Sequence, residues 1–577
     1  MRKETKNKPR VKTQAPAAVA PALPGKFKPQ PKSLYLLPLG GVGEFGMNLT
    51  LYSYGGKWLM VDLGMGFAEE DAPGAELIFP DPSFIAERRQ DLMGLVITHA
   101  HEDHIGAVAW LWPELRCPIY CTPFAATLLR SRLEEKGMEG EVEIHEIRQS
   151  GKFSLGPFAI ETVAVTHSVP EAMMLAITTG QGTVVHTGDW KFDPTPVVGA
   201  VSDKKALERI GRDGVLALAC DSTNILVESR SRSESELNES LEDIFRKCPH
   251  GIVATCFSSN VSRLITISRA ARAVGRKVAL VGRSLRRIEE AARKLGYMKG
   301  VPEFLSDKEA ARIPRNKLVM VATGSQGEPR STMWKLAQQE HPNVSLQPGD
   351  TVVFSSRTIP GNEKEIIRLQ NLLAKLGAEI ITSNDEFVHV SGHPVREEMR
   401  ELYTILKPKI SIPVHGEYVQ LQAQGRLAKE CGVEQIILPE NGSVIRLAPG
   451  NAEVVAKVHS GVLALDGTRL IPLESEALHD RNRIMFGGMA MATVVVDQRG
   501  HLADDPHVTL TGVVEDDESW DAEQEVAEAV VAAMETMNAD TRQDDEALED
   551  EIRAAVRRSI NGFSGKKPVT VVHVVRA

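Results

Sequence analysis

The stretch Leu95-Val96-Ile97-Thr98-His99-Ala100-His101-Glu102-Asp103-His104 places an apolar strand directly before three histidines and an aspartate. Core packing does not account for this cluster, because buried imidazoles and carboxylates are costly without partners. A metal ion supplies such partners, and a loop at a strand end lets several ligands converge. One loop cannot complete two zinc sites, which take about four ligands each. We therefore expect further ligands from other strand ends.

Three later strand ends offer such ligands. His167 closes the run VAVTH, Asp189 closes VVHTGD and His415 closes SIPVH. A lone histidine after a strand is more often structural, but three strand-end residues beside an HxHxDH cluster favour a shared metal site. The remaining histidines show no such convergence, and His186 is expected only to support the turn before Asp189.

Length and composition indicate an ordinary globular protein. A chain of 577 residues is expected to form two or three domains. Hydrophobic residues make up 42% and charged residues 25%, and no apolar run reaches the roughly 20 residues that span a bilayer. The basic start MRKETKNKPRVKTQ lacks the apolar segment of a secretory signal. We expect a cytoplasmic protein, without a membrane role, whose six scattered cysteines stay reduced.

The charges are distributed unevenly along the chain. The formal net charge is −10, but residues 1–32 hold nine Lys or Arg against one Glu. Residues 515–551 instead hold sixteen acidic residues and one Arg. Because polyanion binding depends on a local basic groove, the net charge does not exclude a nucleic-acid substrate.

The sequence texture predicts an α/β protein with five segments. Residues 1–32, rich in Pro, Lys and Ala, form a disordered basic tail. Short strands with glycine turns fill 33–230 and return in 401–455, whereas amphipathic helices alternate with parallel-type strands in 231–400, as in an inserted βαβ domain. Residues 456–577 are expected to hold a linker and a small α+β domain. Its last helix is indicated by an i, i+4 apolar stripe: Leu548, Ile552, Val556 and Ile560.

The ordered set of motifs resembles a known family. The HxHxDH cluster at 99–104, with His167, Asp189 and the upstream Asp62, resembles the metallo-β-lactamase superfamily. The later motifs DST at 221–223, HVSGH at 389–393 and PVHGE at 413–417 resemble its nucleic-acid-cleaving β-CASP branch, in particular the ribonuclease J family. The resemblance covers about residues 33–577. One departure is Pro394, which follows HVSGH where a small residue is more familiar.

The resemblance implies a metallo-β-lactamase αββα sandwich, split by a β-CASP α/β insert and followed by the C-terminal α+β domain. It also implies two zinc ions per chain. One would be held by His99, His101 and His167, the other by Asp103, His104 and His415, with Asp189 bridging them. Catalytic roles are implied for Asp62, Asp103, Asp221 and His393.

Such a pair of metals suits phosphodiester hydrolysis. Two ions about 3.5–4 Å apart lower the pKa of a shared water and neutralise charge on the attacked phosphate. Asp103 would orient or deprotonate the water, and Asp62 would fix the cluster through hydrogen bonds. His393 is the candidate proton donor to the leaving oxygen. The alternative for His393 is a residue that only holds the domain interface.

Two segments could seat a phosphate. The loop His389-Val390-Ser391-Gly392-His393 offers backbone amides and imidazoles as an anion-binding concavity. Ser258, Asn260 and Arg263, at the start of a predicted helix, offer a second seat, although a plain helix cap explains Ser258 and Asn260 nearly as well. The resemblance implies that such a pocket receives a 5′-monophosphate.

The sequence therefore predicts a zinc-dependent ribonuclease acting on single-stranded RNA. We expect a 5′-3′ exonuclease that favours 5′-monophosphate ends, with endonuclease activity left open, and a homodimer or homotetramer formed through the C-terminal domain. Two alternatives remain. One is a hydrolase of a small ester, thioester or lactam, which would not need an insert over the site. The other is a non-catalytic RNA-binding subunit, which would not need complete ligands.

Overall fold

The computed structural model describes residues 27–68, 72–359 and 361–577. The chain divides into two compact units, the first of residues 1–66 and 79–461 and the second of residues 67–78 and 462–577. Residues 1–26 of the predicted basic tail lie outside the described part. Among the described residues, no helix is both long enough and apolar enough to cross a membrane.

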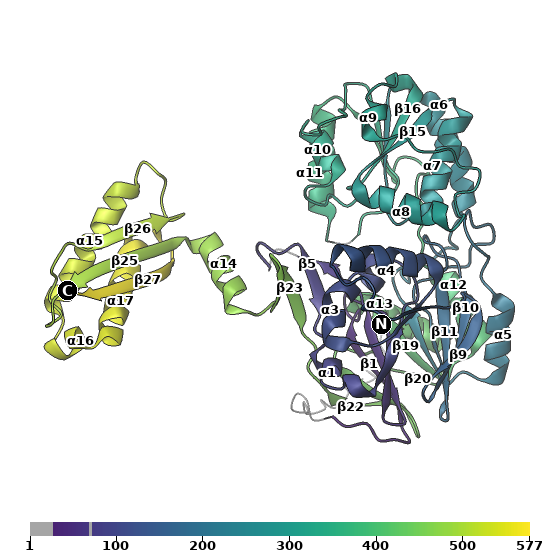
Figure 1. The fold of residues 1–577 in the computed structure, drawn as a ribbon, viewed down its shortest axis with the longest axis horizontal. Coiled ribbons are helices and arrows are strands. Elements are labelled where there is room, and N and C mark those ends of the chain that lie inside the picture. The colour runs from purple at the N-terminus through teal and green to yellow at the C-terminus, as the bar shows by residue number, and fades with distance from the viewer. Residues whose placement is uncertain (1–26, 69–71, 360) are drawn as a thin grey trace, which may run out of the picture. The chain divides into compact units, whose positions relative to one another are not determined.

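Two mixed β-sheets form the core of the first unit (Figure 1). The larger has the order β22-β21-β1-β2-β3-β6-β7-β8, with bounds β1 (Leu34–Gly40), β2 (Leu49–Tyr54), β3 (Lys57–Val61), β6 (Leu92–Val96), β7 (Ile119–Cys121), β8 (Ile144–Glu146), β21 (Ser443–Ala448) and β22 (Glu453–Lys457). The smaller has the order β20-β19-β13-β12-β11-β10-β9, with bounds β9 (Gly151–Leu155), β10 (Phe158–Ala164), β11 (Met173–Thr179), β12 (Gly182–His186), β13 (Ala217–Asp221), β19 (Ile410–Val414) and β20 (Gln435–Ile436).

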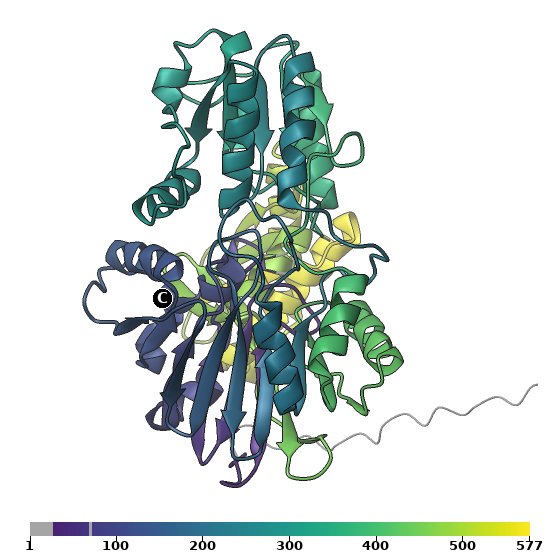
Figure 2. The ribbon, with the colours of Figure 1, turned by 90° about the vertical axis from the view of Figure 1, so that its right-hand side faces the viewer.

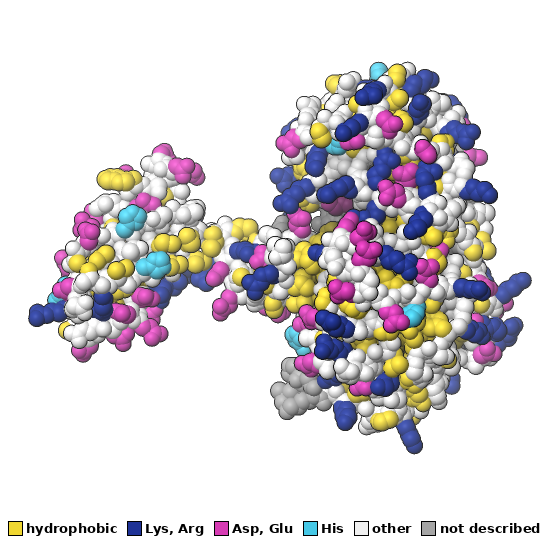
Figure 3. Space-filling model, viewed as in Figure 1, with side chains coloured by type: hydrophobic (Ala, Val, Ile, Leu, Met, Phe, Trp, Pro, Cys, Tyr) yellow, Lys and Arg dark blue, Asp and Glu magenta, His cyan; other side chains and the backbone are white. Residues whose placement is uncertain are grey.

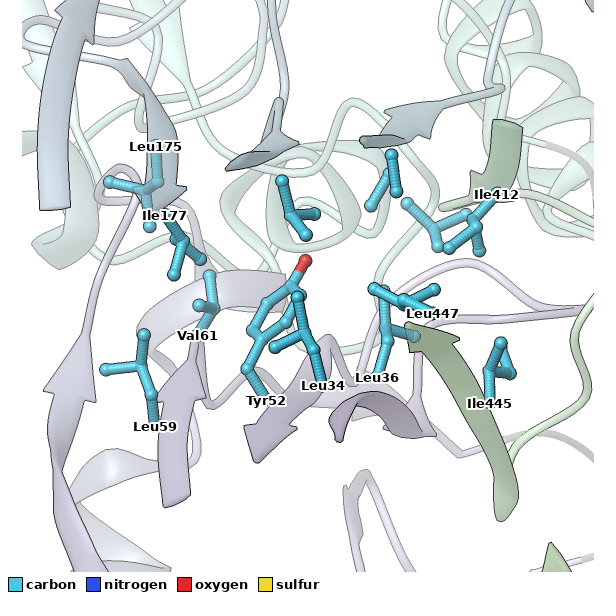
Figure 4. Close-up of a cluster of buried hydrophobic side chains, with 14 of the residues drawn as sticks. Leu34, Leu36, Tyr52, Leu59, Val61, Leu175, Ile177, Ile412, Ile445 and Leu447 are labelled. Carbon is cyan, nitrogen blue, oxygen red and sulfur yellow. The ribbon is translucent and has the colours of Figure 1, made fainter. Parts of the chain in front are cut away.

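The two sheets pack face to face through one hydrophobic cluster. Leu34 and Leu36 of β1, two residues apart, point to the same face and meet Leu175 and Ile177 of β11 in this cluster (Figure 4). All four side chains are completely buried. Each buried Leu or Ile contributes about 1.5–3 kcal/mol relative to exposure, so this interface holds the sandwich together.

Helices complete the sandwich. On the outer face of the smaller sheet, α5 (Lys204–Asp213), α12 (Arg396–Leu406) and α13 (Tyr418–Glu430) bury Leu207, Leu402 and Leu427 against β12 and β13. In the larger sheet, α3 (Val108–Leu115) and α4 (Pro123–Glu135) connect the parallel strands β6, β7 and β8. Shorter elements between β3 and β6 are β4 (Gly66–Phe67), β5 (Leu77–Pro80) and α1 (Ser83–Ala86). The predicted αββα arrangement is confirmed.

The insert is a separate parallel sheet within the first unit, flanked by helices (Figure 2). Its order is β15-β16-β14-β17-β18, with bounds β14 (Ile252–Thr255), β15 (Lys277–Val281), β16 (Leu318–Ala322), β17 (Thr351–Phe354) and β18 (Glu379–Ile381). The helices are α6 (Leu237–Lys247), α7 (Val261–Ala273), α8 (Arg283–Lys294), α9 (Asp307–Ala310), α10 (Thr332–Ala337) and α11 (Glu363–Lys375). Central strands β14, β16 and β17 are buried throughout, as expected of a covered parallel sheet. The predicted βαβ alternation is confirmed.

After the insert the chain re-enters the smaller sheet. Strand β19 lies between β13 and β20 and runs parallel to both. In this register Val414 pairs with Asp221. The next residue, His415, contacts Thr223, which lies 192 positions earlier in the sequence. The re-entry therefore brings a late histidine beside the early strand ends.

The second unit has its own small core. A hairpin, β23 (Val462–Asp466) and β24 (Arg469–Pro472), is followed by α14 (Glu476–Gly487) and by the sheet β26-β25-β27. Its remaining bounds are β25 (Met489–Val496), β26 (His507–Thr511), β27 (Val569–Arg576), α15 (Ser519–Thr536), α16 (Ala539–Gln543) and α17 (Asp545–Ser564). The predicted apolar stripe on α17 is completely buried at all four positions. Acidic side chains lie along much of the face of this unit that Figure 3 shows.

Candidate metal centre

The predicted ligands lie in loops that leave the ends of separate strands. The segment His99–His104 follows β6 and runs into the short helix α2 (Glu102–Ile105). His167 follows β10, Asp189 follows β12, and His415 follows β19 directly. Because these strand ends meet at one edge of the sandwich, the seven predicted ligands come together in two overlapping groups.

The first group contains His99, His101, His167 and Asp189. His99 Nε2 and His167 Nε2 lie 3.5 and 3.7 Å from Asp189 Oδ2. His101 Nδ1 lies 3.1 Å from His99 Nε2 and 3.0 Å from His167 Nε2. Imidazole nitrogens this close need a proton or a cation between them, because two lone pairs repel. Three nitrogens aimed at one point favour a cation.

The second group contains Asp103, His104 and His415, and again Asp189. His104 Nε2 lies 3.4 Å from Asp103 Oδ2 and 3.3 Å from Asp189 Oδ2. His415 Nε2 lies 3.1 Å from Asp103 Oδ2 and 3.8 Å from Asp189 Oδ1. Asp189 thus faces both groups.

Asp189 shows whether a metal fits this arrangement. Its side chain is 2% exposed, and neither carboxylate oxygen has a hydrogen-bond partner among the described residues. A buried carboxylate without partners is strongly unfavourable unless a cation compensates it. The surrounding donors are imidazole nitrogens and carboxylate oxygens, the types that zinc prefers. The residues present therefore fit a metal pair.

Asp62 and Thr98 orient the rings of His99 and His104. Asp62 accepts hydrogen bonds from the Thr98 backbone N–H at 2.7 Å and from the Thr98 hydroxyl at 2.8 Å. The second Asp62 oxygen lies 2.7 Å from His104 Nδ1, and the Thr98 hydroxyl lies 3.0 Å from His99 Nδ1. Asp62 adopts a left-handed backbone conformation, with φ of 61°. These contacts fix which ring nitrogen each histidine presents.

The other histidines are oriented in the same way. His167 Nδ1 lies 2.7 Å from the carbonyl oxygen of Gly392, so its proton is donated to that carbonyl. His415 Nδ1 lies 2.9 Å from the Thr223 hydroxyl, which donates to Asp221 Oδ1 at 2.6 Å. Such contacts leave the opposite nitrogen, Nε2, facing Asp189.

His393 joins the edge of this centre. Its Nδ1 lies 2.8 Å from Asp221 Oδ2 and 3.8 Å from Asp189 Oδ2. Its ring is stacked on that of His415, with centroids 5.5 Å apart. The His393 side chain keeps 22% of its surface exposed, whereas Asp221 is completely buried. The ring therefore combines a fixed orientation with access to solvent.

Burial and charge set the protonation of the centre. Burial and neighbouring imidazoles hold the pKa of His99 and His167 well below the usual range, so both are neutral, the form that ligates a metal. Burial alone would raise the pKa of Asp189, but His415 and His104 hold it well below its usual range. The pKa of His104 and of His415 is raised by the neighbouring carboxylates against the effect of burial. Metal binding would displace protons from these two rings.

The predicted HVSGH loop lies directly against the first group. Gly392 touches the His167 ring so closely that an added Cβ would lie 2.7 Å from two of its atoms. Ser391 Oγ accepts hydrogen bonds from Asn224 Nδ2 at 2.8 Å and from the His393 backbone N–H at 3.2 Å. His389, the first residue of the loop, is held neutral because burial and Arg263 lower its pKa well below the usual range. The loop is built into the centre, with Val390 also buried.

The second predicted phosphate seat has a different arrangement. Asn260 caps α7, because its Oδ1 accepts the Arg263 backbone N–H at 2.8 Å. The Arg263 guanidinium is completely buried and pairs with Glu234 at 2.7 Å. It also donates to the Ser355 hydroxyl at 2.8 Å. Arg263 therefore turns inward and does not present its charge to a ligand, while Ser258 stays half-buried at the helix start.

Three residues of the site were not singled out by the sequence. Thr98 supports His99, Asn224 holds Ser391, and Asn48 Nδ2 lies 3.2 Å from His104 Nε2. Single small polar residues after strands are too common to signal a site. Thr223 belongs to the DST motif, but only the fold shows its contact with His415.

Four family models match successive parts of the chain. The metallo-beta-lactamase superfamily matches residues 42–215, and the beta-CASP domain of ribonuclease J matches 249–373. The Zn-dependent metallo-hydrolase RNA specificity domain matches 377–439, and the ribonuclease J C-terminal domain matches 476–577.

Curated relatives match nearly the whole chain. A ribonuclease J of Sinorhizobium meliloti is 44% identical over 95% of this chain and 98% of its own length. A ribonuclease J of Mycolicibacterium smegmatis is 36% identical over 94% of this chain and 98% of its own. A ribonuclease J of Corynebacterium glutamicum is 35% identical over 98% of this chain and 79% of its own.

A solved structure shares the fold. The crystal structure of a protein of unknown function from Enterococcus faecalis V583 aligns with a TM-score of 0.51 and 16% identity. The alignment covers 72% of this chain and all of the other. At this identity the likeness concerns the fold alone.

Proposed function

Because the chain belongs to the ribonuclease J family, whose members act on RNA with a metallo-hydrolase domain, we propose that this centre holds two zinc ions and cleaves RNA phosphodiester bonds. The observation that carries this proposal is the buried carboxylate of Asp189, which faces both histidine groups and has no other partner among the described residues. His99, His101 and His167 would hold one ion and Asp103, His104 and His415 the other, with Asp189 between them.

Two zinc ions in these positions would supply a water of lowered pKa and positive charge opposite the attacked phosphate. The protein's own contribution is to hold the surrounding groups. The Asp103 side chain is 31% exposed, and adjacent imidazoles keep its pKa well below the usual range against the effect of burial. As a carboxylate it can accept a hydrogen bond from the attacking water and orient it.

His393 and Asp221 would handle the leaving group. Asp221 holds the Nδ1–H of His393, which leaves Nε2 to face a substrate. Burial would lower the pKa of His393, but Asp221 and Asp189 raise it above its usual value. A ring that carries a proton near neutral pH can donate it to the departing sugar oxygen. Asp62 would act only by fixing His104 directly and His99 through Thr98.

The loop His389–His393 supports a preference for RNA with a 5′-monophosphate. Ser391 and Gly392 lie beside the centre, where a hydroxyl and backbone N–H groups can donate hydrogen bonds to a phosphate. We therefore propose 5′-3′ exonucleolytic cutting that favours 5′-monophosphate ends of single-stranded RNA, with internal cutting as a second mode. Lys and Arg side chains spread over the face of the insert that Figure 3 shows, which suits a polyanion despite the net charge.

The two other candidate functions have weaker support. A small ester or thioester would not need the five-stranded insert or the RNA specificity domain that matches residues 377–439. A non-catalytic RNA-binding subunit would not need two complete groups of ligands.

We further propose a homodimer or homotetramer formed through the C-terminal unit. Its surface carries large apolar side chains, with Phe486 76% and Trp520 74% exposed. Exposed apolar residues of this size in a small unit favour contact with another chain.

The test is digestion of a 5′-monophosphorylated single-stranded RNA by the full-length protein loaded with zinc. His101→Ala removes a candidate ligand that belongs only to the first group, with His99, His167 and Asp189. Cleavage should be abolished, while the circular dichroism spectrum stays unchanged. His145→Ala, at a half-exposed histidine outside both groups, is the matched control and should cleave normally. Full cleavage by His101→Ala would contradict the proposal.

A further inference from the structure

The loop that carries His167 is held at both ends. At its base the Val165 N–H donates to the Ala172 carbonyl at 3.1 Å, and Gln149 Nε2 donates to the same carbonyl at 2.7 Å. Near its far end, Glu171 has φ of 64°, a left-handed conformation that is unfavourable for a residue with a side chain. Such a conformation persists only where surrounding contacts hold it.

Glu171 is held through both of its carboxylate oxygens. Oε2 accepts the backbone N–H of Phe124 at 2.7 Å, in the first turn of α4. The N-cap residue Thr122 makes no side-chain capping bond, so Glu171 supplies an acceptor that this helix end needs. Oε1 accepts the Tyr297 hydroxyl at 2.5 Å. One carboxylate therefore joins the His167 loop both to α4 and to the insert.

The end of α8 fixes the position of Tyr297. Helix α8 of the insert lies beside α4 (Figure 1). It is followed by Gly296 in a left-handed conformation, with φ of 80°, and the Tyr297 N–H donates to the Ala292 carbonyl at 2.8 Å, as in a Schellman motif. The Tyr297 ring packs edge-on against Phe124, with centroids 6.1 Å apart. The hydroxyl thus faces Glu171 from a well-defined helix end.

The Tyr297 hydroxyl acts as a donor to Glu171. Burial raises the pKa of Tyr297 above its usual value, and the Glu171 carboxylate raises it further, so the hydroxyl keeps its proton. A hydrogen bond to a carboxylate is stronger than one between neutral groups. Removing the hydroxyl alone would take this donor from Glu171 and leave the ring packed on Phe124.

The first ligand group depends on the position of the same loop. His167 Nδ1 lies 2.7 Å from the Gly392 carbonyl oxygen, and Ser168 Oγ lies 3.2 Å from His101 Nε2. Gly392 belongs to the segment between β18 and α12, on which the chain returns from the insert. Contacts from the insert side therefore reach the loop twice, at His167 and at Glu171.

We propose that Tyr297 and Glu171 are positioning residues for the first metal, because the contact of the insert with α4 sets the His167 loop and thereby the zinc affinity of the first group. This inference rests on the proposed two-zinc ribonuclease function. Neither residue is a candidate ligand, and both act through the backbone of residues 165–172. An insert displaced from α4 would therefore weaken zinc binding.

The test measures the zinc affinity of the full-length protein by competition with a chromophoric chelator. Tyr297→Phe removes only the hydroxyl, and it should weaken the binding of one of the two zinc ions roughly 10-fold, the lower end of the effect of residues that orient metal ligands. Glu171→Ala should weaken the same ion by roughly 10- to 100-fold. Tyr297→Phe should add less than about twofold to the effect of Glu171→Ala, because both changes break one contact.

Arg287→Ala is the matched control, because Arg287 of α8 pairs with Glu135 of α4 across the same interface and neither residue belongs to the His167 loop. It should change the zinc affinity less than about twofold, since exposed ion pairs contribute little. Unchanged zinc affinity in Tyr297→Phe, full additivity in the double variant, or an equal loss in Arg287→Ala would overturn the inference. An unmodified protein that binds no zinc would instead refute the proposed function.

Discussion

Asp189 is the residue on which both ligand groups depend. Its two oxygens are buried, lie 3.3 to 3.8 Å from histidine nitrogens of both groups, and have no hydrogen-bond donor among the described residues. The seven candidate ligands could be predicted from sequence because strand-end histidines and aspartates have a recognisable pattern, and the family resemblance implied that Asp189 bridges them. The distances within the two groups could not be predicted, because they depend on how four separate loops meet.

The direction of the Arg263 side chain could not be predicted from the sequence. Sequence placed it at a helix start beside Ser258 and Asn260, a reasonable site for an anion. Its direction depends on Glu234, which precedes α6 and approaches only in the folded insert. No local pattern carries that information, so an arginine expected to face a ligand instead holds the insert together.

Arg263→Leu should therefore destabilise the protein by about 3–5 kcal/mol, because Glu234 would be left buried and uncompensated. Arg263→Leu combined with Glu234→Leu should be less destabilised than the single variant, since no charge remains unpaired. The measurement is the midpoint of urea unfolding, with Arg269→Leu as the exposed control. A single variant as stable as the unmodified protein would contradict this role for the pair.

Among the secondary-structure elements, the parallel strands of the insert were predicted from the sequence, whereas the return of β19 to the sandwich was not. Hydrophobic runs such as KLVMVATG and DTVVFSS predicted the alternating strands of the insert, because buried parallel strands are apolar throughout. The position of β19 beside β13 could not be predicted from composition. It follows from sheet pairing, which sets Asp221 opposite Val414 and so brings His415 to the centre.

The HVSGH loop provides a prediction at this scale. An alanine at Gly392 would place a Cβ 2.7 Å from the His167 ring, so the loop or the ring must move. Gly392→Ala should lower kcat for RNA cleavage by roughly 10- to 100-fold, since displacements near 1 Å in a catalytic arrangement have effects of this size.

Gly562→Ala is the control for the Gly392 variant, because nothing lies within 4 Å of its added Cβ. Steady-state cleavage of a 5′-monophosphorylated RNA, with zinc in excess, gives kcat for both. An unchanged kcat in Gly392→Ala would contradict the prediction, because it would show that the loop accommodates the added methyl group without displacing His167.

In the whole molecule, the C-terminal unit contributes none of the candidate metal ligands among the described residues. Its buried α17 stripe indicates a separately packed core, and its acidic composition is poorly suited to a polyanion. Phe486→Glu with Trp520→Glu should reduce the mass measured by sedimentation from an oligomer to a single chain, because charge at an apolar contact is costly. RNA cleavage per chain should persist. An unchanged mass would exclude these two residues from the contact.

We propose that one buried carboxylate, that of Asp189, joins two metal ions, and the metal content of Asp189→Asn is the measurement that decides it. Asparagine keeps the shape of the side chain but removes its charge and one of its two ligand oxygens. Elemental analysis should find about two zinc ions per unmodified chain and at most about one in the variant. The variant should also lose RNA cleavage while its circular dichroism is unchanged. Two tightly bound ions and full cleavage in Asp189→Asn would contradict the claim.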